Sequence, residues 1–232
     1  MKKLTSIIAI LILGAGSVFA QNAFVGGHRA WTFAVQGGML YSLNENCFTY
    51  RDNGEGLKLF TPQGSAAIGY EFTNALGARL SVGYGLNRSA GNHYQTAAYG
   101  YYPYSFKSVN AFLDATLDMN GLFEVERAFR PVFYLGVGLG HTFGFTDPHH
   151  PWQGAYLTTN NNAFGFRGGF IAEFDFTPSF GLFLDLGGEA YTDNYNGLRP
   201  AKVDHDHYSG YAGFPLDLRF MGSFGLIYRF NY

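Results

Sequence analysis

Hydrophobic and polar residues alternate with a period of two over most of this chain. The pattern is clearest from Asp217 to Tyr232, where one parity holds only apolar residues, aromatic residues and glycine, and the other holds every charge. Such alternation predicts a β-strand with one apolar face. No helix-period segment of comparable strength follows the first twenty residues. The eight predicted strands span residues 31–41, 66–72, 78–86, 109–119, 133–139, 164–176, 182–190 and 217–232.

Charged residues in these eight windows all lie on the same strand face as Gly, Ser and Asn. Alternation alone does not say which face points outward, because a soluble barrel would turn its charges to water. The opposite face, however, is uninterrupted and ends in aromatic residues, as a lipid-facing strand requires. We therefore predict that the apolar face is outside. The predicted interior charges are Glu71, Arg79, Asp114, Arg167, Glu173, Asp185, Glu189, Asp217, Arg219 and Arg229.

The connections between the predicted strands alternate in length. Short ones lie around Asn74 and Ser179, and residues 120–130 form an intermediate one. Short periplasmic turns that alternate with long extracellular loops are typical of outer-membrane barrels. The sequence thus predicts an all-β fold, an eight-stranded antiparallel up-and-down transmembrane β-barrel. Its long loops would be residues 42–65, 87–108, 140–163 and 191–213.

The first twenty residues have the features of an export signal. Lys2 and Lys3 precede an apolar run over 7–13, which is too short to cross a bilayer, and Val18-Phe19-Ala20 fits a cleavage site. We therefore predict a cleaved signal peptide at 1–20 and a barrel domain at 21–232.

Composition agrees with an aromatic-rich barrel and excludes some other classes. The chain of 232 residues has 32 Gly, 24 Phe and 17 Tyr, and only 14% charged residues, fewer than a soluble domain usually carries. Its net charge of −2 includes two signal-peptide lysines, so the mature chain is at −4 (13 basic minus 17 acidic residues), which argues against nucleic-acid binding. Cys47 is the single cysteine, so no intrachain disulfide is expected.

The signal peptide, the eight strands and the terminal GLIYRFNY together resemble the small OmpA/OmpX-type outer-membrane barrels. The Gly- and Tyr-rich character is most similar to barrel proteins of Bacteroidetes, and the resemblance covers residues 29–232. It implies a place in the bacterial outer membrane, among its lipids. It also implies insertion by the barrel-assembly machinery, which in that family reads a terminal aromatic signal; Tyr228, Phe230 and Tyr232 would carry it here.

The interior charges have two interpretations. They could form a path for protons or ions. However, an eight-stranded barrel is only wide enough for its own side chains, and buried charges must be paired. We therefore expect a sealed, paired polar interior. One expected pair is Glu71 with Arg79, placed opposite each other by a three-residue turn at Asn74 to Leu76.

Histidines in the long loops are weak candidates for metal binding. Imidazole and carboxylate groups suit zinc or copper, but the spacing of these residues does not match common zinc motifs. We therefore expect no metal site and no cofactor. The candidates are Asp204, His205 and His207 in the last loop, and His149 and His150 in the third.

An enzyme of the lipid A-modifying class is a further alternative. His141-Thr142 lies at the end of the fifth predicted strand, but no Ser is nearby, so we predict that the chain is not an enzyme. The Tyr-rich stretch 99–106 fits an interfacial girdle or a recognition surface. The predicted role is structural or surface-interaction, with an extracellular partner for the long loops, and a small porin-like channel or transporter remains an alternative.

Overall fold

The chain forms a closed β-barrel in the computed structural model, which describes residues 30–43, 56–89, 104–125, 127–146, 160–192, 195–197 and 216–231. A 3-10 turn, η2 (Gly56–Leu59), precedes the second strand, and a short helix, α4 (Met119–Leu122), follows the fourth. In these described ranges no helix is long and apolar enough to span a membrane. The strands are β1 (Ala30–Leu43), β2 (Phe60–Glu71), β3 (Leu76–Ser89), β4 (Tyr104–Asp118), β5 (Phe129–Phe143), β6 (Asn161–Thr177), β7 (Phe180–Thr192) and β8 (Leu216–Asn231).

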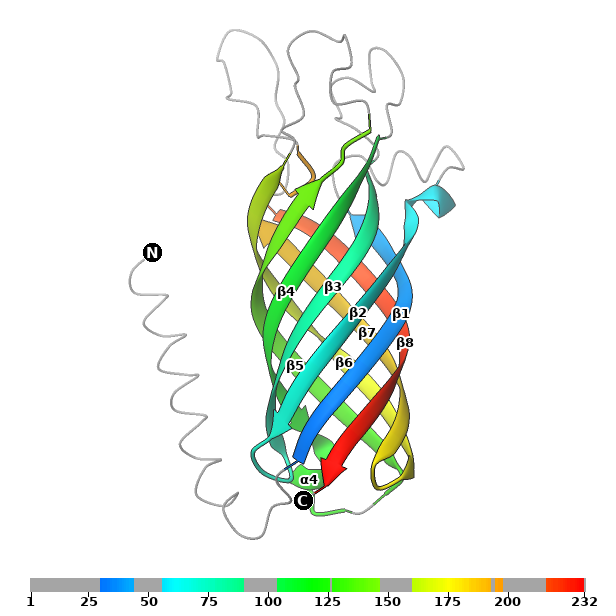
Figure 1. Cartoon of the computed structure of the whole chain (residues 1–232), viewed down its shortest axis with the longest axis vertical. Coiled ribbons are helices and arrows are strands. Elements are labelled where there is room, and N and C mark those ends of the chain that lie inside the picture. Colours follow the sequence, from blue (N-terminus) through cyan, green and yellow to red (C-terminus); the bar gives the residue numbers. More distant parts are fainter. Residues whose placement is uncertain are drawn as a thin grey trace, which may run out of the picture.

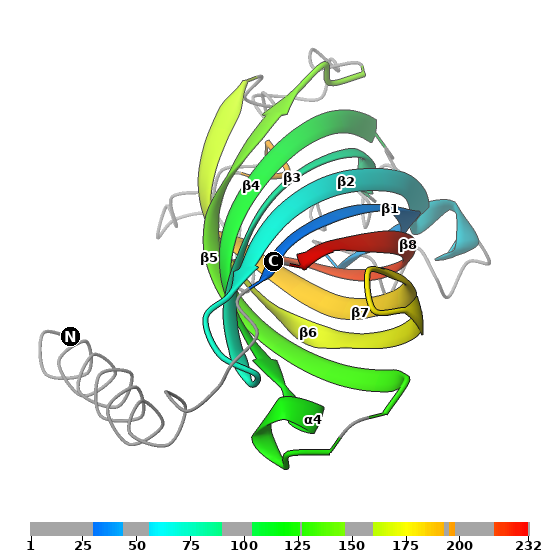
Figure 2. The same cartoon turned by 60° about the horizontal axis from the view of Figure 1, so that its bottom comes forward.

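Each strand pairs with its neighbours in sequence, and β8 closes the sheet by pairing with β1 (Figures 1 and 2). The closing ladder is continuous from Ala30 opposite Asn231 to Leu43 opposite Leu218. Because the sheet closes, no strand is left with an unpaired edge. The predicted eight-stranded, antiparallel, up-and-down fold is confirmed.

The apolar face of the strands is the outer one, as predicted. Leu135 and Leu139 on β5, for example, expose 74% and 64% of their surface, whereas the adjacent Tyr134 is 2% exposed. Every observed strand begins before its predicted window, and β1, β3, β5, β6 and β7 also end after it, whereas β2, β4 and β8 end one residue before the end of theirs. Pro62 in β2 and Pro131 in β5 interrupt the alternation there, so the pattern ends before the strand does.

The two ends of the barrel differ. The connections 72–75 and 178–179 lie at the lower end in Figure 1, together with α4 and the described residues 123–125 and 127–128 that follow it; we call this the short-turn end. At the opposite, long-loop end the strands lead into residues 44–55, 90–103, 147–159 and 198–215, which lie outside the described part of the chain.

Asp118 begins α4 as its N-cap, since its carboxylate accepts a hydrogen bond from the Asn120 amide at 2.8 Å.

The predicted pairing of Glu71 with Arg79 is wrong. Glu71 lies opposite Gly77, and Arg79 lies opposite Gly69 on β2 and Asp114 on β4. The register therefore differs from the expected one by two residues. Because a shift of two residues preserves the face on which a side chain lies, both side chains keep their predicted inward direction.

The cause of this shift is the position of the turn between β2 and β3. The turn is centred one residue earlier than expected, on Asn74, because the Phe72 amide donates to the Leu76 carbonyl at 2.9 Å. Within the turn, the Thr73 hydroxyl accepts hydrogen bonds from the amides of Ala75 and Leu76, at 3.2 and 2.9 Å. A side chain of the turn itself thus stabilises the observed register.

Glycines on β6 and β7 make room for a large inward side chain. Gly169 and Gly187 are direct cross-strand partners, and the hydroxyl end of Tyr134 lies over both. A Cβ atom at either position would collide with the Tyr134 hydroxyl group. These glycines therefore allow an aromatic ring to fill the bore of a narrow barrel.

A positive charge in the middle of the outer face should be costly. Leu184 points outward near the centre of β7, and we expect Leu184→Arg to lower the free energy of unfolding in lipid vesicles by about 2–4 kcal/mol. The matched control is Leu57→Arg, because Leu57 in η2 is already 82% exposed. Reversible unfolding in denaturant would measure both. Equal tolerance of the two substitutions would contradict the assignment of the outer face to lipid.

Candidate functional site

The middle of the bore is occupied by a network of two arginines and two aspartates, which we call the central network (Arg79, Asp114, Arg167 and Asp185). Asp114 is fully buried and accepts hydrogen bonds from both guanidinium groups: Arg79 Nε at 2.9 Å and Arg167 Nε at 2.6 Å. Asp185, also fully buried, lies 4.0 Å from Arg79 Nη1. The two positive and two negative charges balance within this layer.

Neutral groups complete the central network. The Tyr134 hydroxyl donates to Asp185 at 2.8 Å, and Arg167 donates to the Ser81 hydroxyl at 2.5 Å. The Arg79 guanidinium stands 4.7 Å from the centre of the Tyr134 ring, and Arg167 stands 4.5 Å from that of Phe112. These cation–π contacts satisfy the faces of guanidinium groups that hydrogen bonds leave uncovered.

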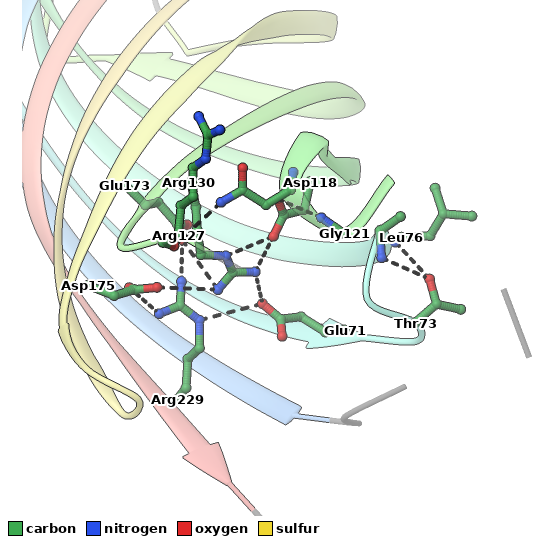
Figure 3. A network of polar contacts seen from close by, with 12 residues as sticks. Glu71, Thr73, Leu76, Asp118, Gly121, Arg127, Arg130, Glu173, Asp175 and Arg229 are labelled. Atoms are coloured by element: carbon green, nitrogen blue, oxygen red, sulfur yellow. Dashed lines mark hydrogen bonds and ion pairs between the residues drawn. The ribbon is translucent and has the colours of Figure 1, made fainter. Parts of the chain in front are cut away.

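A second network fills the short-turn end of the bore and is shown in Figure 3; we call it the short-turn network. Arg130 of β5 donates to Asp118 at 2.7 Å and to Glu71 at 3.1 Å. Arg229 of β8 lies beside it and donates to Glu173 and, at 2.6 Å, to Asp175. Two cations therefore bridge carboxylates from β2, β4 and β6. The members are Glu71, Asp118, Arg130, Glu173, Asp175 and Arg229.

A third network lies toward the long-loop end and is centred on Arg219 of β8. The guanidinium donates to Glu189 at 2.8 Å, to Asn87 at 2.9 Å and to the Tyr191 hydroxyl at 3.0 Å. Tyr195 accepts a further hydrogen bond from Arg219 at 2.5 Å, and its ring stacks on Tyr191 with the ring centres 3.9 Å apart. We call this the long-loop network; it surrounds one buried arginine with acceptors and aromatic rings.

An aromatic cap closes the bore above this network. Phe106 of β4 stacks on Phe145, with ring centres 4.9 Å apart, and the edge of Tyr195 meets Phe106. The segment 195–197 is anchored on both sides. The Tyr104 hydroxyl donates to the Asn196 carbonyl at 2.7 Å, and the Asn196 amide donates to Asp217 at 3.1 Å. A short segment beyond β7 thus returns into the mouth of the barrel.

Little space remains between these layers. A cavity of about 60 Å³ lies near Glu71 and Glu173, and another of about 10 Å³ lies beside Gln36 and Arg167. These two cavities have room for a few water molecules at most. A larger hollow of about 900 Å³ lies at the short-turn end, beside Arg130 and Asp175, and is open to the outside. In the described part of the chain, paired charges and aromatic rings therefore fill the bore.

The structure places all ten sequence-predicted interior charges inside the barrel, distributed over the three networks and Asp217. Glu71, at the short-turn end, is the most accessible of those in ion pairs, with 27% of its side chain exposed. Tyr228 and Phe230 of the predicted assembly signal face outward on β8, and Tyr232 lies outside the described residues. The loop candidates His149, His150, Asp204, His205 and His207 also lie outside them.

Several residues of the networks were absent from the predicted set. Asp118 and Asp175 have the parity of the other inward charges, so the alternation did contain their signal. Arg130 precedes Pro131, and the predicted strand began only after that proline. Tyr195 and Asn196 carry no periodic signal, because their position depends on the path of the chain after β7.

The directions of the side chains argue against two interpretations from the sequence: a reactive pair at His141-Thr142, and a girdle or recognition surface at the described end of the Tyr-rich stretch. His141 faces outward, where its Nδ1 lies 2.9 Å from the Asn162 side-chain oxygen, whereas Thr142 faces inward and is fully buried. These neighbours lie on opposite faces of β5 and do not form one reactive site. Tyr104 and Phe106 are buried in the aromatic cap, so this part of the Tyr-rich stretch is neither a membrane girdle nor an exposed recognition surface. Among the described residues, no group of three His, Cys, Asp or Glu is arranged to hold a metal ion.

Comparison with solved structures identifies the same fold in small outer-membrane barrels. The barrel resembles OprG of Pseudomonas aeruginosa (TM-score 0.52, 13% identity, 89% of this chain and 99% of that chain covered). It also resembles Neisserial surface protein A (TM-score 0.51, 10% identity, 87% of this chain and 99% of that chain covered). A third similar structure is a major outer membrane protein of Thermus thermophilus (TM-score 0.50, 21% identity, 86% of this chain and 99% of that chain covered). No protein-family model and no curated protein matches the chain.

Removing the shared carboxylate of the central network should destabilise the barrel. Asp114→Asn removes the anion that Arg79 and Arg167 share and leaves Asp185, 4.0 Å from Arg79, as the remaining carboxylate of the network; we expect a loss of about 3 kcal/mol in unfolding free energy. The matched control is Glu124→Gln, the same chemical change at an exposed position, which should stay within about 0.5 kcal/mol of the wild type. Denaturant unfolding in vesicles measures both. If the two variants are equally stable, the bore is hydrated and the pairing contributes little.

Proposed function

We propose that this protein is an integral outer-membrane barrel with a sealed interior, and that its role is structural or surface-interaction. The observation that carries the proposal is the filled bore: three charge networks and an aromatic cap occupy it from one end to the other. Such a barrel offers no route for a solute through its centre. Any interaction with other molecules must then take place on its outer face or at its two ends.

The wall supports a membrane location. Outward positions carry large apolar residues on every strand, for example Phe33 on β1 and Phe224 on β8, which expose 47% and 58% of their surface. In a soluble protein an exposed apolar surface of this extent would cause aggregation. The three similar solved structures are of outer-membrane or surface proteins, which agrees with this location.

The long-loop end is the proposed site of surface interaction. Four long stretches of sequence lead out of it, and the short-turn end has compact turns instead. We propose that the long-loop end faces the cell exterior and that its loops meet an extracellular partner. Export by the signal peptide at 1–20 and insertion through the terminal aromatic strand are parts of the same proposal.

Planar-bilayer recordings test the sealed bore. We expect no steady ion conductance from the purified, folded wild-type protein, because paired side chains fill the bore. Tyr134→Ala, which removes a ring from the central layer, is the informative variant. Reproducible wild-type channels that widen in Tyr134→Ala would refute the sealed interior and favour the channel or transporter.

Labelling of inserted tags in intact cells tests the orientation. Tags at Gly100 and Gly154, in long-loop sequences, should react with an impermeant reagent added outside, whereas tags at Asn74 and Ser179 should not. Lysed cells provide the control that every tag is reactive. External labelling at Asn74 or Ser179 would reverse the proposed orientation.

A further inference from the structure

The outer face of the barrel carries three basic side chains within the described strands, and all three lie near its long-loop end. They are Arg88 on β3, Lys107 on β4 and His141 on β5. The same described strands carry no carboxylate on the outer face; their acidic residues all point into the bore. The outer face therefore has one local concentration of positive charge on an otherwise apolar wall.

The three residues form an oblique row across neighbouring strands. Arg88 is opposite Ser105, so Lys107, two residues further along β4, is its diagonal neighbour. Lys107 is opposite Phe143, so His141 is its diagonal neighbour on the other side. Diagonal positions on one face of a sheet are about 7–8 Å apart at Cα, within reach of long side chains. One small anionic group can therefore contact two members of the row.

The two permanent cations of this row are not neutralised within the described part of the chain. The interior arginines are held by carboxylates, whereas no described carboxylate lies within ion-pair distance of Arg88 or Lys107. The buried Nε–H of Arg88 meets no acceptor among those residues. The Lys107 stem lies against Gly144, which has a positive φ of 63° and no side chain to occupy that position.

The row lies at the border of the apolar wall. The next outward residues toward mid-barrel are Leu86, Val109 and Leu139, which are exposed and apolar. The neighbouring outward residues Ser105 and Asn162 are polar. In a membrane, cations at such a border extend their charged ends to the head-group layer, where they attract anionic lipids.

We propose that Arg88 and Lys107, with His141 at the end of the row, bind the phosphate group of a membrane lipid. This inference rests on the proposed membrane location. Arg88 supplies a planar fork of donors that suits phosphate oxygens, and Lys107 adds a second charge from the adjacent strand. The ligand is a lipid and not free phosphate, because the apolar wall directly below the row accommodates acyl chains.

The experiment measures lipid retention by the whole folded protein. The barrel is inserted into nanodiscs of phosphatidylcholine that contain a minor share of phosphatidic acid, extracted in mild detergent, and analysed by native mass spectrometry. We expect preferential retention of phosphatidic acid by the wild type. The double variant Arg88→Gln/Lys107→Gln should lose this preference by about tenfold or more.

Two controls separate a defined site from general charge. Lys58→Gln removes one positive charge from η2 at the same end of the barrel and should leave the preference unchanged. The charge-conserving Arg88→Lys/Lys107→Arg should keep most of it. Folding of each variant is checked by circular dichroism, and because neither residue belongs to the interior networks, the variants should fold.

The outcomes distinguish this inference from the proposed function. If the barrel inserts but retains both lipids equally, or if Lys58→Gln is as harmful as the double variant, the phosphate site is refuted and the membrane location stands. If inorganic phosphate alone binds to the protein in pure phosphatidylcholine nanodiscs, the assignment to a lipid is refuted. If the barrel does not enter nanodiscs at all, the proposed function itself fails.

Discussion

Pairing of arginine with carboxylate inside a narrow bore is the interaction on which the rest of this structure depends. A guanidinium group removed from water without a counter-ion would cost several kcal/mol, and an eight-stranded barrel leaves little room for solvating water. Each interior arginine is therefore held by carboxylates of other strands, as Asp114 joins Arg79 and Arg167. Some of these bridges also cross the bore between strands that are not neighbours in the sheet, as from Arg167 on β6 to Asp114 on β4. The contacts that neutralise the charges therefore also block the barrel.

The filled bore also explains the pattern on the wall. Charged and small residues are needed inside, where glycines such as Gly169 give space to Tyr134, and apolar residues are needed outside. With the centre closed, interactions with other molecules are left to the lipid-facing wall and the two ends. The cationic row from Arg88 to His141 stands out because it departs from this rule, being outward and without a carboxylate partner among the described residues.

The alternation of the sequence was sufficient for the number of strands, their faces and the direction of the interior charges. It could not supply the register, because an alternation with a period of two does not say which residue of one strand lies opposite which residue of the next. The sequence therefore predicted Arg79 as the partner of Glu71, whereas its partners in the structure are Arg130 and Arg229. Residues at strand ends were missed for a related reason. The alternation is interrupted at Pro131, so the predicted strand began after it and did not include the inward Arg130. The cap formed by Tyr195 depends on a returning segment, which no periodic pattern encodes.

The most direct test of the account is solvent exchange of the arginine side chains, measured by nitrogen-15 NMR on the barrel in lipid nanodiscs. The Nε–H groups of Arg79, Arg167 and Arg219 donate to buried carboxylates, whereas Arg127 in the short-turn connection is exposed and serves as the internal reference. A sealed, paired bore predicts slow exchange with water at the three interior positions and fast exchange at Arg127. Exchange as fast at Arg79 and Arg167 as at Arg127 would show a hydrated bore and contradict the account.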